Sequence, residues 1–275
     1  MTKNVANHYT SGDLFDRIMA ALKDDGADPD QPTIAALAPY DQFHGRGLEA
    51  TEDVASLLSL MASDHVLDVG SGIGGPARFM ADRFGCRVTG IDLTPVFCDV
   101  ARWLTTRLGM DDRVSIEIGD ALAMPFADAS FDAAYSMNVS MNIADKDGLY
   151  AELARVLKPG ARLVLSEFAR GDGPEPEYPL PWARTAETSI LATFEATRSG
   201  LEGAGFVIVQ ARDTAAESKD FGARSKALVE RGKKPPHRSV PLVHGEAAAV
   251  MMANSSRAVA EGRILPIEIL ARKRD

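Results

Sequence analysis

Short apolar runs alternate with amphipathic segments from His65 onward, and this alternation indicates the fold class. The runs that predict strands are HVLDV, CRVTGID, RVSIEIGD, FDAAYSM, ARLVLSEF, FVIVQARD and ILPIEILARK. Most are separated by segments of helical periodicity, such as KDGLYAELARVL, in which Leu149, Leu153 and Val156 share one face. Strands that alternate with helices build a parallel sheet with right-handed crossovers and helices on both faces. We therefore expect an α/β protein with a doubly wound sheet.

Polar and helical segments outside this alternation predict helical caps. Residues 1–62 are polar with helical periodicity, and a segment near 170–190 is rich in proline and glycine. A stretch near 214–262 separates the last two strands; its ~50 residues are too long for a bare loop in a compact domain. We predict an N-terminal helical cap at 1–62 and a core at 63–275, with the other two segments as cap insertions.

Composition excludes several classes of partner and compartment. The net charge of −9 argues against a broad surface for nucleic acid or an anionic membrane, so neither partner is expected. Two cysteines cannot build a secreted disulfide framework at this length. No run approaches the length of a membrane span, and residues 1–30 lack a leader pattern, which predicts a cytoplasmic protein. The histidines lack metal-site spacing, so no metal is expected, and a homodimer is left open.

The stretch VLDVGSGIGGPARF carries the strongest motif. Gly70, Gly72 and Gly75 match the spacing G-x-G-x-x-G of a dinucleotide-binding turn, which is weak support alone. Asp68 stands two residues before the first glycine. Because an acid at this position repels a pyrophosphate, the motif indicates a different ligand.

Further acids follow successive predicted strands. Ligands of open α/β sheets bind outside the carboxyl ends of the strands, where Asp68, Asp92, Asp120 and Asn138 are expected. Asp92 is 22 residues beyond Gly70, the spacing at which an acid accepts hydrogen bonds from ribose hydroxyls. Three acids around one pocket suit a cationic ligand. S-adenosylmethionine, with a sulfonium, an ammonium and no phosphate, fits better than NAD, although an NAD-dependent oxidoreductase stays the alternative.

The chain also resembles a known family. VLDVGSGIGGPARFMADRFGCRVTGIDLT, GDALAMPFADASFDAAYS and LARVLKPGARLVLSE are similar to successive motifs of class I S-adenosylmethionine-dependent methyltransferases, over about Val66 to Glu167. DQFHGRGLEATEDVASLL and PLPWARTAETSILAT resemble a subgroup related to sarcosine/dimethylglycine N-methyltransferases and to ubiquinone and menaquinone biosynthesis methyltransferases. The resemblance implies a mostly parallel, seven-stranded, Rossmann-like sheet whose last strand is antiparallel, with helical cap elements.

The resemblance implies a cofactor, S-adenosyl-L-methionine with S-adenosyl-L-homocysteine as product, and roles for individual residues. Gly70 and Gly72 would lie against the methionine part of the cofactor. Asp92 would bind its ribose, and Asp120 would contact the edge of its adenine. The cofactor-binding residues expected from the strand ends and the resemblance together are Gln42, Asp68, Gly70, Ser71, Gly72, Asp92, Leu93, Asp120, Ala121 and Asn138.

The acceptor side is less clear from sequence. Relatives often carry a histidine after the fourth strand, whereas SMNVSMNIAD has none, so the catalytic residues are unknown and His44 and Asn142 are the candidates. His237 and His244 are further histidines that could fold into the pocket. The substrate candidates are Arg46, Trp182 and Arg184, through cation–π contact or pairing with a carboxylate.

A missing base favours an amine acceptor, because a neutral amine attacks a sulfonium methyl group without prior deprotonation. The expected function is therefore methylation of a small molecule, with N-methylation of a glycine-, sarcosine- or dimethylglycine-type amine as the leading hypothesis. The alternatives are an O- or C-methyltransferase of natural-product or quinone biosynthesis, and a catalytically silent binding protein of the same fold.

Overall fold

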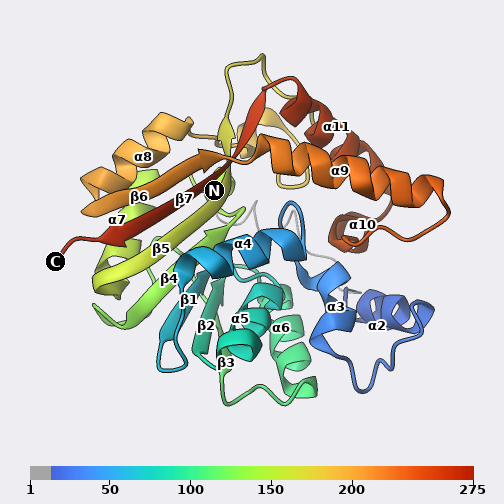
Figure 1. The fold of residues 1–275 in the computed structure, drawn as a ribbon, viewed down its shortest axis with the longest axis horizontal. Coiled ribbons are helices and arrows are strands. Elements are labelled where there is room, and N and C mark those ends of the chain that lie inside the picture. The colour runs from blue at the N-terminus through green and yellow to red at the C-terminus, as the bar shows by residue number, and fades with distance from the viewer. Residues whose placement is uncertain (1–13) are drawn as a thin grey trace.

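The computed structural model describes residues 14–275 and centres on a seven-stranded sheet (Figure 1). The strand order is β3-β2-β1-β4-β5-β7-β6, and β7 runs antiparallel to both β5 and β6 while neighbours among β1 to β5 pair in parallel. The strands are β1 His65–Val69, β2 Arg87–Asp92, β3 Val114–Ile118, β4 Phe131–Met137, β5 Leu157–Arg170, β6 Phe206–Asp213 and β7 Ile264–Lys273. The sheet predicted from the sequence is confirmed.

Helices cover both faces of this sheet. The helices of the core are α4 Leu48–Leu58, α5 Gly75–Phe84, α6 Pro95–Arg107, α7 Lys146–Val156 and α8 Phe194–Gly203. The first three pack on one face and the last two on the other. Strand residues alternate accordingly: in β1, Val66 is buried against α4 to α6, whereas Leu67 is buried against the opposite layer. The two apolar layers fix the carboxyl ends of β1 to β4 at one edge.

Further helices gather beyond that edge (Figure 1). They are α2 Leu14–Asp24, α3 Ile34–Asp41, α9 Ala215–Glu230, α10 Ser239–His244 and α11 Ala248–Ala260. In Figure 1, α9 and α11 pass above the sheet edge, while α10 lies against α2 and α3. None of the helices in residues 14–275 is long and apolar enough to cross a membrane.

One expectation about the helices was wrong. Helical periodicity near Ala215 to Arg231 and Val243 to Gly262 predicts two helices between β6 and β7. The structure has three α-helices there, because Gly245 adopts a φ of +55° that separates α10 from α11. α3 contains Pro39 and is apolar nearly all round, so hydrophobic periodicity gives little signal for it.

A buried ion pair joins α3 to α5. Arg78 is fully buried, and its Nη2 lies 2.9 Å from Oδ2 of Asp41, the last residue of α3. Oδ1 of Asp41 accepts a hydrogen bond from Nε2 of Gln42 at 2.8 Å. The two helices approach closely because Gly75 has no side chain: a Cβ there would lie 2.2 Å from the carbonyl oxygen of Asp41. The third glycine of the fingerprint therefore makes room for α3.

Removing one partner of this pair should strongly destabilise the fold. Arg78→Met would leave the buried carboxylate of Asp41 without its cation, and we expect the free energy of unfolding to fall by about 3–5 kcal/mol. The double variant Arg78→Met/Asp41→Asn should recover much of this loss because the uncompensated charge is gone. Urea unfolding of the single and double variants measures both effects. A change below about 1 kcal/mol in Arg78→Met would contradict the assigned role.

Candidate functional site

Two adjoining cavities lie at the carboxyl ends of the strands. The smaller, of about 290 Å³, follows β1, β2, β3 and β4. Nine of the ten predicted cofactor residues line it, all except Gln42: they are Asp68, Gly70, Ser71, Gly72, Asp92, Leu93, Asp120, Ala121 and Asn138. The topology thus brings together residues that are up to 70 positions apart in the chain, from Asp68 to Asn138.

The glycine turn after β1 is held against β2. The amides of Gly70 and Ser71 donate to the carbonyl oxygen of Ile91 at 2.8 and 3.1 Å. Gly70 has a φ of +74°, and a Cβ there would lie 2.2 Å from Cγ2 of Val139. Only glycine meets both conditions. The turn therefore forms a close-packed wall of the smaller cavity rather than a flexible loop.

Asp92 links the glycine turn to the start of α6. Its Oδ2 accepts from the amide of Gly72 at 2.9 Å, and its Oδ1 accepts from the amide of Thr94 at 2.8 Å. Each carboxylate oxygen has a second lone pair, so Asp92 can also accept from two ligand hydroxyls. Burial raises the pKa of Asp92 despite these two amides, which lower it. The arrangement suits a ribose diol.

Asp68 points to a cationic ligand. It is buried at the end of β1, and its Oδ2 has no hydrogen-bond partner among residues 14–275. Burial raises the pKa of Asp68 to about 7. Oγ of Ser71, in the same cavity, is likewise buried without a partner in the described chain. The Tyr135 hydroxyl and the charge of Arg78 lower the pKa of Asp68 only in part. A buried carboxylate with one unsatisfied oxygen is costly, and a cation that reaches it would stabilise it. The ammonium group of S-adenosylmethionine fits this position.

The opposite end of the smaller cavity suits a purine. Asp120 accepts from the amide of Leu122 at 2.9 Å through Oδ1 and lines the cavity beside the apolar side chains of Ile91, Leu93 and Phe97. A carboxylate next to an apolar slot matches the exocyclic amine and the faces of adenine. The residues present therefore fit S-adenosylmethionine along the whole cavity.

Asn138 stands where the two cavities meet. It has a φ of +58°, and its Oδ1 accepts from the amide of Gly45 at 2.8 Å. The segment after it is fixed by Glu167, whose buried carboxylate accepts from the amides of Val139 and Ser140 at 2.9 and 3.1 Å. Phe43, His44 and Asn138 line both cavities. The N-terminal segment thereby closes over the cofactor region.

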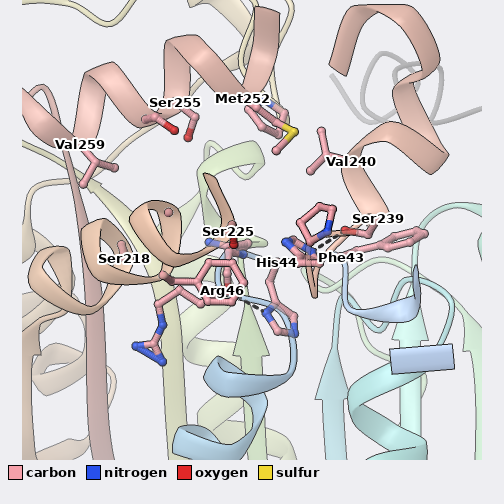
Figure 2. Close-up of a pocket in the computed structure, with 18 of the residues that line it drawn as sticks. Phe43, His44, Arg46, Ser218, Ser225, Ser239, Val240, Met252, Ser255 and Val259 are labelled. Carbon is pink, nitrogen blue, oxygen red and sulfur yellow. Dashed lines mark hydrogen bonds between the residues drawn. The ribbon is translucent and has the colours of Figure 1, made fainter. Parts of the chain in front are cut away.

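The larger cavity, of about 720 Å³, lies between residues 43–46 and the cap helices (Figure 2). Figure 2 shows Met252, Ser255 and Val259 on one side of this space, with Phe43, His44 and Arg46 on the other. Its aromatic lining residues are Phe43, Phe168, Trp182, Phe221 and three histidines. Among residues 14–275, none of those that line it is an aspartate or a glutamate. In a chain with a net charge of −9, the described lining of this cavity carries only neutral and basic side chains.

The substrate candidates occupy different places. Trp182 lines the larger cavity; its Nε1 donates to Oγ of Ser189 at 3.0 Å, and its ring stacks on Phe168 with centroids 4.9 Å apart. Arg46 also lines it, but its guanidinium is paired with Asp53. Arg184 is exposed and lines neither cavity. Of the three, only Trp182 both lines the cavity and is free of an ion pair within the described chain.

The two catalytic candidates both have partners within the protein. His44 lies with Nδ1 3.2 Å from the carbonyl oxygen of Gly45 and Nε2 3.1 Å from Oγ1 of Thr51, and burial lowers its pKa to about 3. Asn142 donates from Nδ2 to the carbonyl oxygens of Trp182 and Thr188 at 2.9 and 3.4 Å. Asn142 thus holds the segment near 170–190 in place.

Gln42 is buried behind the smaller cavity and does not line it. Its Oε1 accepts from Oγ1 of Thr51 at 2.6 Å, and its Nε2 donates to Asp41. Sequence reasoning missed Asp41 and Phe43, which do line the cavity on either side of Gln42. The only indication of their role in the sequence is that they flank Gln42, a predicted cofactor residue. Among residues 14–275 no three His, Cys, Asp or Glu side chains are grouped as metal ligands, and His8 lies outside the described residues.

Comparisons with known proteins agree with this site. Residues 67–165 match a family model described as a methyltransferase domain. The curated methyltransferase GfsG of Streptomyces halstedii is 34% identical over 164 residues, which cover 57% of each chain. The solved structure of the [4+2]-cyclase SpnF covers all of this chain and 97% of its own, with a TM-score of 0.70 and 22% identity. Phosphoethanolamine N-methyltransferase 2 of Haemonchus contortus, solved with S-adenosyl-L-methionine, covers 89% of this chain and 58% of its own, with a TM-score of 0.71 and 20% identity.

The chain spans only part of the curated relatives that it matches first, between 28% and 60% of their lengths. These matches include O- and C-methyltransferases, and N-methyltransferases follow. The sheet order, the acids at three successive strand ends and the matched domain all point to one family. Residues 67–165 therefore carry a methyltransferase domain, and the fold of the chain is that of class I S-adenosylmethionine-dependent methyltransferases.

Proposed function

We propose that the protein methylates a bulky, mainly apolar small molecule at an oxygen or carbon atom. The observation that carries this proposal is the larger cavity of about 720 Å³, which meets the smaller cavity at Phe43, His44 and Asn138. No carboxylate lines it in the part of the chain that the structure describes. Its size lies in the upper part of the usual range for pockets that hold drug-sized ligands.

The cavity does not favour the small-amine hypothesis. A glycine-type acceptor would leave most of the volume unfilled. Its ammonium or amine group would also meet Lys219, Lys226 and Arg46 in the lining, and no acid. The one buried cation that could recognise an acceptor carboxylate, Arg46, already pairs with Asp53. An uncharged or anionic acceptor with several rings or a long apolar chain matches the lining better.

The two cavities would hold the methyl donor and the acceptor separately. S-adenosylmethionine supplies an electrophilic methyl group on its sulfonium sulfur. Asp68 would pair with its ammonium group and Asp92 with its ribose, which fixes the direction of the methyl group. Phe43 and the cap helices would surround the acceptor on its apolar sides and limit the access of water to it. Proximity and orientation then account for most of the rate acceleration.

A second candidate function is cofactor binding without methyl transfer. SpnF is named as a [4+2]-cyclase, and its structure is similar over the whole of this chain. The fold is therefore found with an activity other than methyl transfer. A binding or non-methylating role for this chain would show as cofactor binding without methylation.

An acceptor panel tests the proposal. Purified protein is incubated with radiolabelled S-adenosylmethionine and four groups of acceptors: multi-ring phenols, apolar polyketide-like alcohols, quinols, and glycine, sarcosine or dimethylglycine. We expect methylation of one or more apolar acceptors and none of the amino acids. Methylation of sarcosine or dimethylglycine alone would contradict the proposal. Binding of S-adenosylhomocysteine with no methylation of any acceptor would favour the non-methylating alternative.

Loss of Asp92 should weaken the cofactor without unfolding the chain. In Asp92→Ala two ligand hydroxyls lose a charged acceptor, so we expect S-adenosylhomocysteine to bind about 10- to 100-fold more weakly in calorimetry. Asp99→Ala is the matched control, because Asp99 is an exposed acid on α6 paired only with Arg102. Equal affinities of Asp92→Ala and the wild type would exclude the ribose role.

Binding of S-adenosylhomocysteine should also depend on pH through Asp68. With a pKa of about 7, this side chain is largely protonated below that pH in the free protein. Since the ligand's ammonium requires the carboxylate, affinity should rise as pH increases from about 6 to 8, by up to about tenfold per unit below the pKa. Asp68→Asn should bind more weakly and lose this dependence. A pH-independent affinity in the wild type would refute the ammonium contact.

A further inference from the structure

We infer that His237 takes the proton from a hydroxyl acceptor during methyl transfer. This rests on the proposed function and narrows it to O-methylation. His237 lies in the cap, 195 positions along the chain from Gln42, whose carbonyl oxygen it contacts. His237 lines the larger cavity, between α9 and α10. It would supply the base that the segment after β4 lacks.

A backbone carbonyl sets the tautomer of His237. Its Nε2 lies 2.8 Å from the carbonyl oxygen of Gln42 and 2.6 Å from Oγ of Ser239. A carbonyl oxygen only accepts hydrogen bonds, so Nε2 carries the ring hydrogen. In a neutral imidazole the lone pair is then on Nδ1, for which no hydrogen-bond partner is found among residues 14–275. This is the arrangement of a histidine base oriented by a second group.

Contacts with the N-terminal segment place the ring near the junction of the cavities. A Cβ on Gly47 would lie 3.2 Å from Cβ, Cγ and Cδ2 of His237, so the ring packs directly against this glycine. Gln42, which orients the ring, is followed at once by Phe43 and His44, the two residues that line both cavities. On the other side, Phe221 of α9 approaches with ring centroids 6.3 Å apart.

The surroundings keep the ring neutral. Burial lowers the pKa of His237. Within residues 14–275, the other titratable or charged groups that line the cavity are His44, Arg46, Lys219, Lys226 and His244, none of which is an acid. No carboxylate of this lining therefore stabilises an imidazolium before reaction. His44 is a poorer base, because both of its nitrogens have protein partners and its pKa is lowered to about 3.

The proposed step balances. The acceptor oxygen forms a bond to the methyl carbon while the bond from that carbon to sulfur breaks, and the bonding pair stays on sulfur. The hydroxyl proton moves to Nδ1 of His237, which becomes an imidazolium. The exposed residues Lys219 and Lys226 lie in the cavity lining, so the cavity reaches solvent and the proton can leave to water.

Nuclear magnetic resonance tests the base without an acceptor. Ring ¹⁵N shifts of the protein bound to S-adenosylhomocysteine are assigned by comparison with His237→Gln. We expect His237 to be neutral at pH 7, with hydrogen on Nε2 and a bare Nδ1. A ring protonated on Nδ1, or charged at this pH, would overturn the inference whether or not an acceptor is known.

Kinetics with two acceptors of equal shape, 2-naphthol and 2-naphthylamine, separate a base from a packing residue. In His237→Gln the amide can still donate to Gln42 but cannot accept the proton. We expect methylation of 2-naphthol to fall about 100-fold or more, while that of 2-naphthylamine, which attacks as a neutral amine, changes little. His65→Gln is the matched control, since His65 bonds to Thr89 at the opposite edge of the sheet.

The outcomes distinguish the two proposals. Equal losses with both acceptors in His237→Gln, or a comparable loss with 2-naphthol in His65→Gln, would overturn the role of His237. If the wild type methylates neither acceptor, the result counts against the proposed acceptor class, and the ring shifts alone decide on His237.

Discussion

The buried ion pair between Arg78 and Asp41 is the interaction on which the arrangement of the site depends. Arg78 belongs to α5, the helix that follows the glycine turn, whereas Asp41 ends the N-terminal helix α3. The pair fastens the start of residues 42–47 above the glycine turn. That segment contributes Phe43 and His44 to both cavities, and its Gln42 carbonyl orients His237. One charge–charge contact thus connects the sheet, the N-terminal helices and the C-terminal cap.

The distribution of charge separates the two ligands. Asp41, Asp68, Asp92 and Asp120 all line the smaller cavity, whose expected occupant carries a sulfonium and an ammonium group. No acid lines the adjoining larger cavity among the residues that the structure describes. A cationic methyl donor is therefore favoured in one compartment and a neutral or anionic acceptor in the other. For His237 in the larger cavity, burial lowers the pKa, and no acid among the described lining residues opposes this shift.

The sheet and the residues that line the smaller cavity were predictable because their signals are local. A parallel strand is an apolar run, and the residue that follows it lies at the sheet edge wherever the strand is placed, as Asp68 and Asp92 show. The acceptor cavity was not predictable in this way. Trp182, Phe221 and Met252 come from separate cap segments, and only tertiary packing brings them together. Asp41 has no local signal either, since its partner Arg78 is 37 positions away. Resemblance to relatives placed Gln42 at the cofactor, whereas the structure buries it one layer behind.

A crystal structure of the protein with S-adenosylhomocysteine tests the central claim most directly. The account predicts the ligand in the smaller cavity, with its ammonium group at Asp68, its ribose hydroxyls at Asp92 and its sulfur at the opening bordered by Phe43, His44 and Asn138, facing the larger cavity. A ligand whose sulfur is walled off from the larger cavity, or whose ammonium group lies away from Asp68, would contradict the account.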